Sequence, residues 1–280
     1  MSLDPELVRR AADAIRGAGA LLVTAGAGMG VDSGLPDFRG DEGFWNAYPP
    51  YRHLGLSFVD LANPEWFRRD PAVAWGFYGH RRNLYRRTRP HRGFELLRAW
   101  GEAAPGGAFV FTSNVDGQFQ RAGFPAERVV ECHGAIDWSQ CLAGCGAGIF
   151  PADPGEVAID ERSMRAADPL PACPRCGGLA RPNILMFGDW GWEGEREEEQ
   201  GRRLRAWQAE NVSRPLAVIE LGAGSAIPTV RRTSEVVARN HPGGGTLIRI
   251  NPRESQAPAG AIGLPAGALA GLEAIEAALR

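Results

Sequence analysis

The 280-residue sequence contains no lysine, so arginine supplies all 31 of its basic side chains. A GC-rich coding sequence explains this usage without any functional cause. A strong net charge is also missing, because 33 acidic side chains leave a formal net charge of −2 and an isoelectric point of about 6.2. A near-neutral chain has no electrostatic footprint for nucleic acid or for an anionic membrane surface.

Long apolar runs are absent too, since none approaches the roughly 20 residues that a membrane span requires. The first residues, MSLDP, lack the basic region and apolar segment of a secretory signal. We therefore expect a cytoplasmic protein that binds neither membrane nor nucleic acid. The hydrophobic content of 44% is ordinary for a globular protein, and the length allows one large domain with a small inserted module.

Residues 21–40, LLVTAGAGMGVDSGLPDFRG, combine a short apolar run with a glycine-rich segment. The apolar run has the length and composition of a buried parallel strand. Closely spaced Gly26, Gly28 and Gly30 let backbone N–H groups approach a ligand, and a following helix N-terminus favours an anion there. The segment predicts a site for a dinucleotide pyrophosphate, although a plain structural turn would explain the glycines taken alone.

The sequence does not match the dinucleotide-binding fingerprint of enzymes that transfer hydride. That fingerprint needs a glycine where Val31 stands, and an acidic residue that closes a second strand about 20 positions further on. Asp41 and Glu42 occur near that place, but they lie in a polar loop rich in glycine and proline. The sequence therefore argues against a dehydrogenase.

Further apolar runs predict strands, and each is followed by glycine, asparagine, aspartate or histidine. They lie at residues 108–111, 129–130, 183–187, 216–221 and 246–250. Apolar periodicity predicts helices at residues 7–15 and 94–100, and residues 41–89 read as short helices and loops. In open parallel sheets ligands bind at the carboxyl ends of the strands. One shared cleft in an α/β fold with a doubly wound parallel sheet therefore accounts for these endings.

Four of the five cysteines form two short-spaced pairs, Cys141 with Cys145 and Cys173 with Cys176. Two such pairs can hold one tetrahedral ion through four thiolates, which leaves no coordination position open for chemistry. The spacing predicts a structural zinc site, with coincidental core cysteines as the alternative. A zinc ribbon that binds nucleic acid would show the same pairs, but the near-neutral charge argues against it. The fifth cysteine, Cys132, is expected to be a buried thiol at a strand end.

The segment SGLPDFRG at residues 33–40 resembles the first motif of the sirtuin family, the NAD-consuming protein deacylases. Later sirtuin motifs are resembled in the same order by TSNVDG at 112–117, ECHG at 131–134, RPNILMFGD at 181–189, GAGS at 222–225 and IN at 250–251. Gly30 and Ser113 depart from the family pattern, which usually has serine and glutamine there.

The resemblance implies a division of the chain into three parts. A Rossmann-like NAD-binding domain would comprise residues 1–40, 90–136 and 182–280. A helical lid would be inserted at residues 41–89, and a zinc-binding module at residues 137–181. The fold class implied is therefore α/β, with a Rossmann-like doubly wound parallel sheet and a smaller zinc-binding and helical part.

The resemblance also implies that the cofactors are NAD and Zn²⁺ and that His133 is a general base. An imidazole with a pKa of about 6.5 suits proton abstraction from a ribose hydroxyl, although a lone histidine is often structural. Asp116 and the Val115 backbone would bind the nicotinamide carboxamide, and Asn114 would position the ribose or a water. The other residues implied to contact NAD are Gly26, Ala27, Gly28, Asp37, Phe38, Arg39, Ser113, Gly222, Gly224, Ser225, Asn251 and Ile262.

The segment FYGHRR at residues 77–82 resembles the FYxxRR of sirtuins that remove succinyl and malonyl groups. Tyr78 and Arg81 would then grip the distal carboxylate of the acyl group, and Ala62 would leave room for it. A guanidinium forms paired, charge-assisted hydrogen bonds with a carboxylate that acetyl lacks. The alternative is that Tyr78 and Arg81 merely cover the lid surface. Other residues implied at the acyl substrate are Ile184, Phe187 and Gly188.

We therefore predict an enzyme, an NAD-dependent protein-lysine deacylase that acts on acyl-lysine proteins or peptides. It would release nicotinamide and O-acyl-ADP-ribose. An ADP-ribosyltransferase or NAD hydrolase using the same cleft is the alternative, but His133 favours the deacylase because transfer alone needs no base for a ribose hydroxyl. Trp190 and Trp192 replace the usual family segment, and they either pack in the core or form an aromatic wall beside the acyl-lysine channel.

Overall fold

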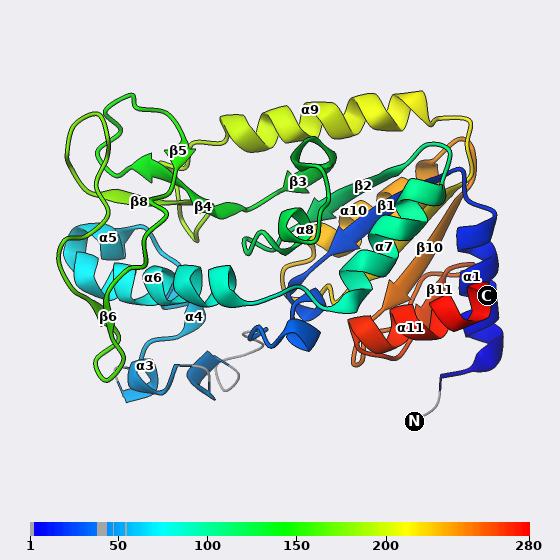
Figure 1. The fold of residues 1–280 in the computed structure, drawn as a ribbon, viewed down its shortest axis with the longest axis horizontal. Helices are drawn as coiled ribbons and strands as arrows, with labels where there is room; N and C mark the ends of the chain where they lie inside the picture. The colour runs from blue at the N-terminus through cyan, green and yellow to red at the C-terminus, as the bar shows by residue number, and fades with distance from the viewer. Residues whose placement is uncertain (1–2, 38–43, 47, 54) are drawn as a thin grey trace.

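The computed structural model of the protein describes residues 3–37, 44–46, 48–53 and 55–280. Within these residues the main element is a six-stranded parallel sheet with the strand order β11-β10-β9-β1-β2-β3 (Figure 1). Its strands are β1 (Ala20–Ala25), β2 (Ala108–Thr112), β3 (Val129–Glu131), β9 (Leu216–Leu221), β10 (Gly245–Ile250) and β11 (Ile262–Leu264). The predicted parallel α/β fold is confirmed, and β11 is a strand that the sequence pattern did not reveal.

Helices cover both faces of this sheet, as a doubly wound fold requires. One face packs against α1 (Pro5–Arg16), α7 (Arg92–Ala103) and α11 (Ala268–Leu279), and the other against α9 (Glu195–Glu210) and α10 (Thr229–Asn240). The strands β1 and β9 are buried at all six positions, which explains why each reads as a continuous apolar run. Helix α1 includes the predicted residues 7–15 and begins two residues earlier, at Pro5, because the Asp4 carboxylate caps it by accepting the Glu6 N–H at 2.8 Å.

A separate antiparallel sheet joins β5 (Phe150–Pro151), β4 (Gly134–Cys141) and β8 (Ala180–Ile184). The predicted strand at residues 183–187 is therefore wrong in its bounds and in its sheet. Strand β8 begins earlier because two of its polar side chains are buried and paired with β4. Gln140 accepts hydrogen bonds from Arg181 at 3.3 Å and from Asn183 at 3.0 Å. Polar residues satisfied in this way do not register as part of an apolar run.

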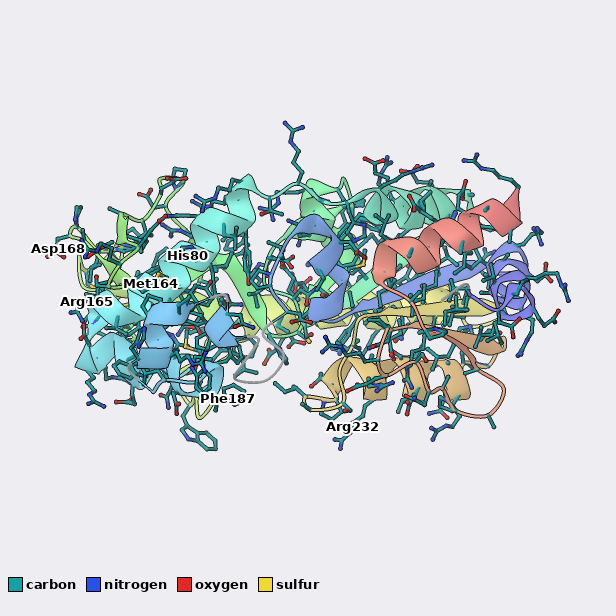
Figure 2. All side chains as sticks on the ribbon, turned by 90° about the horizontal axis from the view of Figure 1, so that it is seen from below. His80, Met164, Arg165, Asp168, Phe187 and Arg232 are labelled. Atoms are coloured by element: carbon teal, nitrogen blue, oxygen red, sulfur yellow. The ribbon has the colours of Figure 1, made fainter. Side chains whose placement is uncertain are left out.

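The predicted lid segment contains the expected short helices α3 (Pro49–His53), α4 (Phe58–Leu61) and α5 (Glu65–Arg69), followed by the longer α6 (Pro71–Arg87). Aromatic rings fill their interior: Phe77 lies edge-on to Phe44, Tyr48 and Tyr51 at centroid distances of 5.8, 5.5 and 6.1 Å. A hairpin of β6 (Ile159–Asp160) and β7 (Arg165–Ala166) packs against α6, where Figure 2 labels Arg165.

Shorter elements complete the chain. They are α8 (Gln118–Arg121) and the 3₁₀ helices η1 (Ala27–Met29), η2 (Val31–Ser33) and η3 (Ala126–Arg128). Among the described residues, no helix is both long and apolar enough to cross a membrane. The elements η1 and α8 follow strands β1 and β2 at the carboxyl edge of the parallel sheet, which is where open parallel sheets bind ligands.

Candidate active site

The glycine loop, residues 26–30, meets the loop that follows β9. The Gly28 N–H donates to the Gly222 carbonyl at 3.1 Å. A Cβ on Gly26 would lie 2.8 Å from Cα of Ala223, and one on Gly222 would lie 2.4 Å from Cα of Gly28. Gly222 also has a left-handed φ of 59°. The two loops therefore approach too closely for side chains at Gly26 and Gly222, so glycine is required at both strand ends.

The loop after β2 is tied to the glycine loop. The Asn114 side-chain amide donates to the Gly26 carbonyl at 3.0 Å, and the Ser113 N–H donates to the Ala25 carbonyl at 3.1 Å. The Asn114 N–H is in turn held by the Thr112 hydroxyl at 3.0 Å. The structure thus brings together two predicted NAD-binding segments that lie almost 90 residues apart in the sequence.

Asp116 lies buried against the same loop. Its Oδ2 is 3.7 Å from the position that a Cβ on Gly30 would occupy, and its Oδ1 accepts the Gln118 N–H at 2.9 Å. Burial raises the pKa of the Asp116 carboxyl to about 6, against the opposing effects of the Gln118 N–H and the Arg121 guanidinium. Buried groups with strongly shifted pKa values gather at functional sites.

The Gly30 departure from the sirtuin pattern has a packing explanation. A Cβ at this position would approach Cδ1 of Leu35 to 3.1 Å. Leu35 is buried at the edge of the aromatic lid core, so a serine at residue 30 would press on this side chain. The missing Cβ therefore makes room for Leu35 next to Asp116. We found no comparable structural reason for Ser113.

His133 lies between β3 and β4, where the parallel and antiparallel sheets adjoin. Its carbonyl accepts the Leu185 N–H at 3.0 Å, which ties it to the segment after β8. Burial lowers the pKa of the His133 imidazole, so the ring is neutral and able to accept a proton at neutral pH. The neighbouring Cys132 is half-buried, and burial raises the pKa of its thiol to about 12, which keeps it protonated and unreactive.

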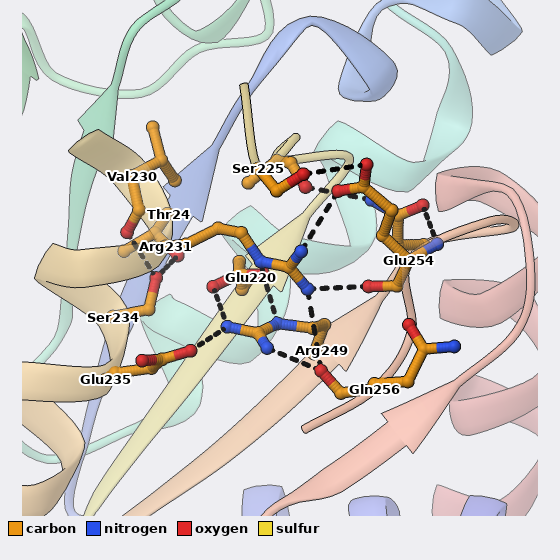
Figure 3. Close-up of polar contacts among 12 residues, drawn as sticks. Thr24, Glu220, Ser225, Val230, Arg231, Ser234, Glu235, Arg249, Glu254 and Gln256 are labelled. Atoms are coloured by element: carbon orange, nitrogen blue, oxygen red, sulfur yellow. Dashed lines mark hydrogen bonds and ion pairs between the residues drawn. The ribbon is translucent and has the colours of Figure 1, made fainter. Parts of the chain in front are cut away.

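A charge network, buried at Glu220 and Arg249, lies next to Ser225, one of the residues predicted to contact NAD (Figure 3). Ser225 donates to the Glu254 carboxylate at 3.1 Å, and the same carboxylate accepts Arg231 at 3.0 Å. Arg249 lies behind them, with bonds of 2.5 and 3.0 Å to Glu220 and 2.7 Å to Glu235.

Sequence reasoning missed this network. A charged residue inside the apolar run at 216–221 was the available signal, because an ionised side chain in a buried strand needs a partner of opposite charge. Glu220 and Arg249 occupy paired positions on β9 and β10. They also bring order to the polar segment after β10, since Arg249 donates to the Gln256 carbonyl at 2.6 Å.

Asn251 links the two loops at this end. Its side chain donates to the Ala223 carbonyl at 2.9 Å and accepts the N–H groups of Arg253 and Glu254 at 3.0 and 2.9 Å. Ile262 is buried in the sheet, where it pairs with Ile248. Asn251 therefore stabilises both loops through its hydrogen bonds. Its contact with NAD stays a prediction.

The structure describes only part of the first motif. Phe38 and Arg39 lie outside the described residues. Asp37 is partly buried at the end of the described segment. Their predicted contacts with NAD therefore stay predictions, as do those of Ala27 and Gly224.

Tyr78 and Arg81 are buried, with 1% and 7% of their surface exposed, so the lid-surface interpretation is wrong. Nε of Arg81 donates to the Tyr85 hydroxyl at 2.9 Å, and its guanidinium carbon lies 5.1 Å from the centre of the Phe77 ring. Burial raises the pKa of the Tyr78 hydroxyl to about 12, so it stays protonated and can donate a hydrogen bond. An arginine surrounded by aromatic rings suits the capture of an anion in an apolar setting.

The segment after β8 reaches across to the lid. The Phe187 N–H donates to the Ala62 carbonyl at 2.8 Å, which brings two predicted acyl-site residues together. Gly188 follows with a left-handed φ of 66°. Phe187 and Gly188 line a cavity of about 490 Å³ together with lid residues such as Val59. Ile184 is buried in the core beneath.

Trp190 is 99% exposed, so its interpretation as a core residue is wrong. The Asp189 carboxylate accepts Arg181 at 2.5 Å and the Gly191 N–H at 3.2 Å. These bonds close a tight turn that leaves Trp190 outside, on the rim of a second cavity of about 290 Å³. Trp192 is partly buried.

The four paired cysteines converge as predicted. Their sulfur atoms lie within 4.8 Å of one another, with 3.7 Å between Cys141 and Cys176 and 3.6 Å between Cys145 and Cys173. A tetrahedral ion with Zn–S bonds of about 2.3 Å would separate its sulfur ligands by about 3.8 Å. The cluster therefore fits zinc without rearrangement. With four protein ligands the ion would be structural.

These features define a class, an α/β nucleotide-binding protein with a small metal-binding part. A family model described as the Sir2 family matches residues 26–197. The chain is 34% identical over 169 residues to an NAD-dependent protein deacylase of Aquifex aeolicus, and 35% identical over 185 residues to NAD-dependent protein deacylase sirtuin-5, mitochondrial, of Danio rerio. Each match covers 60% of this chain, and 62% and 57% of the respective relative.

The structural comparison extends over most of the chain. A point mutant of a Sir2 homologue, solved as a complex with ADP ribose, matches with a TM-score of 0.71 and 25% identity. The match covers 96% of this chain and 95% of that one. The protein described here therefore belongs to the Sir2 family.

Proposed function

We propose that this protein is an NAD-dependent protein-lysine deacylase. The observation that carries the proposal is the meeting of the glycine loop, Asn114 and Asp116 at the carboxyl edge of the parallel sheet. Membership of the Sir2 family supports the same reaction, as do the two relatives named as deacylases. The substrate would be an acyl-lysine in a protein or peptide.

Each residue has a chemical role in this proposal. Bound NAD would supply the reactive ribose carbon and the nicotinamide leaving group. Asp116 and the Val115 backbone would hold the nicotinamide carboxamide, in a buried setting that excludes water and strengthens each polar contact. Asn114 would orient the ribose or a water. His133, neutral at physiological pH, would accept a proton at its ring nitrogen from a ribose hydroxyl.

The preferred acyl group is a finer proposal. Tyr78 and Arg81 would bind a distal carboxylate, as in succinyl- or malonyl-lysine, and Ala62 would leave space beside Phe187. Burial of the Arg81 guanidinium among aromatic rings supports this, since an acyl carboxylate would meet it in a medium of low dielectric constant. The similarity to a relative named sirtuin-5 is consistent with it.

Two further proposals concern organisation and location. The division into residues 1–40, 90–136 and 182–280, a lid at 41–89 and a zinc-binding module at 137–181 is supported by the separate parallel and antiparallel sheets, although β4 runs across the boundary at 136. A cytoplasmic location is supported by the four-cysteine cluster, because reduced thiolates persist in a reducing compartment.

Mass spectrometry of the products tests the proposed reaction. The protein is incubated with NAD and matched acetyl-, malonyl- and succinyl-lysine peptides. A deacylase yields nicotinamide, free lysine peptide and O-acyl-ADP-ribose in equal amounts. An ADP-ribosylated peptide that keeps its acyl group would identify a transferase instead, and free ADP-ribose formed without any peptide would identify an NAD hydrolase.

A further inference from the structure

The β6–β7 hairpin connects the zinc-binding module to the lid helix α6. In the sequence the hairpin lies between the two cysteine pairs, in the segment from Cys145 to Cys173. In space it lies along α6, the helix that carries the proposed acyl site, and Figure 2 labels its Met164 and Arg165 beside that helix. Residues 157–166 are called the clamp hairpin below.

Two glycines of α6 allow the clamp hairpin to reach the helix backbone. A Cβ on Gly76 would lie 1.9 Å from the Met164 carbonyl oxygen, and one on Gly79 would lie 2.8 Å from Cβ and Cγ1 of Val157. Neither glycine has a left-handed φ, so close packing is the reason that a side chain is excluded. Any larger residue would push the hairpin and the helix apart.

Polar contacts fix the hairpin at both ends of the helix. Asn83 donates to the Val157 carbonyl at 2.8 Å and accepts the Val157 N–H at 3.1 Å, so one buried amide satisfies both backbone groups. Arg165 makes two bonds, of 2.8 and 2.9 Å, to Asp70, the residue that caps the start of α6. These contacts hold the helix against both sliding and rotation.

The clamp contacts and the acyl site occupy opposite faces of α6. Gly76, Gly79 and Asn83 follow one another at helical spacings of three and four residues. The same spacings relate Tyr78, Arg81 and Tyr85. At about 100° per residue the two sets point about 160° apart. A helix packed through its backbone on one side cannot shift without moving the side chains on the other.

We propose that the clamp hairpin determines acyl specificity by setting the position of Tyr78 and Arg81 relative to the acyl-lysine. Asn83 is accordingly a positioning residue that never touches the substrate. The acyl groups concerned are those with a distal carboxylate, since their two charge-assisted bonds depend most on the placement of Arg81. This inference rests on the proposed deacylase function.

The test compares kcat/KM for succinyl-lysine and acetyl-lysine forms of one peptide, using the zinc-loaded full chain. In Asn83→Ala the succinyl-to-acetyl ratio should fall about tenfold, while KM for NAD and the zinc content stay within twofold of the parent values. Arg162→Ala, on the exposed turn of the same hairpin, is the matched control and should leave the ratio unchanged.

Arg165→Ala provides a second variant, because its side chain is 47% exposed and its loss is expected to leave the fold intact. It should shift the same ratio in the same direction by a smaller factor. An unchanged ratio in both variants, with an active parent, would make the hairpin a merely structural element and overturn the inference alone. A parent that deacylates neither peptide would overturn the proposed function, and the inference with it.

Discussion

The parallel sheet and the smaller part beside it achieve their order in different ways. Every position of β1 and β9 is buried, and the sheet is covered by helices on both faces. Hydrophobic burial of this kind is distributed over many residues, so no single contact dominates it. The sheet therefore follows directly from the apolar runs in the sequence.

The smaller part also has a buried core, built around aromatic rings such as Phe77, but it depends on additional localised contacts. Helices α3, α4 and α5 have only four or five residues each, which is too few for a helix to be stable by itself in water. These helices pack their side chains into the aromatic core. The rest of the smaller part is also held by a four-cysteine cluster that fits zinc and by glycines of α6 that allow close approach. Because the cysteine cluster and the glycine contacts are localised, single substitutions at these positions should disturb this region more than single substitutions disturb the sheet.

Removal of one zinc ligand should have the largest effect, and it should destabilise the smaller part much more than the parallel sheet. Cys173→Ser should lose the metal, whose apparent binding energy in small zinc modules is about 10–16 kcal/mol and contributes directly to folding. Amide exchange should accelerate in β4, β8 and the clamp hairpin and stay slow in β1 and β9. Elemental analysis gives the metal content, with Cys132→Ser as the control that keeps its zinc. Full metal content in the Cys173 variant would contradict its assignment as a ligand.

Loss of the base should affect chemistry and leave both regions folded. His133→Ala should bind NAD with nearly unchanged affinity but deacylate roughly 10²–10⁴-fold more slowly, which is the usual contribution of a general base. Calorimetry measures the binding, and product release from acetyl- and succinyl-lysine peptides measures the rate. Turnover at the parent rate on both peptides would leave His133 with only a structural role.

Asp116 tests whether a buried charge at the proposed NAD site lowers the stability of the parallel-sheet region. Burial raises its pKa from 3.8 to about 6, so the native state binds this proton more tightly than the unfolded chain does. The protonated carboxyl therefore stabilises the native state at low pH. The free energy of unfolding falls by up to about 3 kcal/mol as the pH rises from about 4 to 6.

Asp116→Asn should therefore be more stable than the parent at pH 7 by up to about 3 kcal/mol, and equal to it below pH 4, while NAD turnover is lost. Urea unfolding at both pH values, without NAD, measures the difference. A variant less stable than the parent at pH 7 would show that burial of the charge is fully compensated in the native state.

Arg81→Met tests how strongly one buried side chain of the lid determines the preference for succinyl-lysine over acetyl-lysine. A charge-assisted bond contributes roughly 1.5–3 kcal/mol, so kcat/KM for succinyl-lysine should fall about 10–100-fold more than that for acetyl-lysine. Arg87→Met, on the exposed side of α6, is the control. Equal losses on the two substrates would remove the proposed preference for a negatively charged acyl group.

The sequence revealed those features that depend on local pattern. Apolar runs located β1, β2, β9 and β10, and cysteine spacing predicted the four-sulfur cluster. The resemblance to sirtuin motifs identified segments that prove to meet in space, such as Asn114 with Gly26.

Features that depend on long-range pairing were not predictable in this way. Strand β8 was misplaced because Arg181 and Asn183 are buried polar residues that pair with Gln140, some 40 residues away. The contacts of Gly76 and Gly79 with the clamp hairpin leave no signal in helical periodicity, because a glycine in a helix normally indicates only reduced stability. The exposure of Trp190 depends on a turn closed by Asp189, which no composition rule reports.

Trp190 should show the smallest effect on stability of any tryptophan in the chain that the structure describes. At 99% exposed it buries almost nothing, so Trp190→Ala should change the free energy of unfolding by less than about 0.5 kcal/mol. Trp207→Ala is the matched control, since Trp207 is 2% exposed and its removal should cost about 3–5 kcal/mol. KM for an acyl-lysine peptide should rise about two- to tenfold in the Trp190 variant if one aromatic contact with the substrate is lost. An unchanged KM would exclude the aromatic wall, and a large loss of stability would mean that Trp190 packs against the protein in solution.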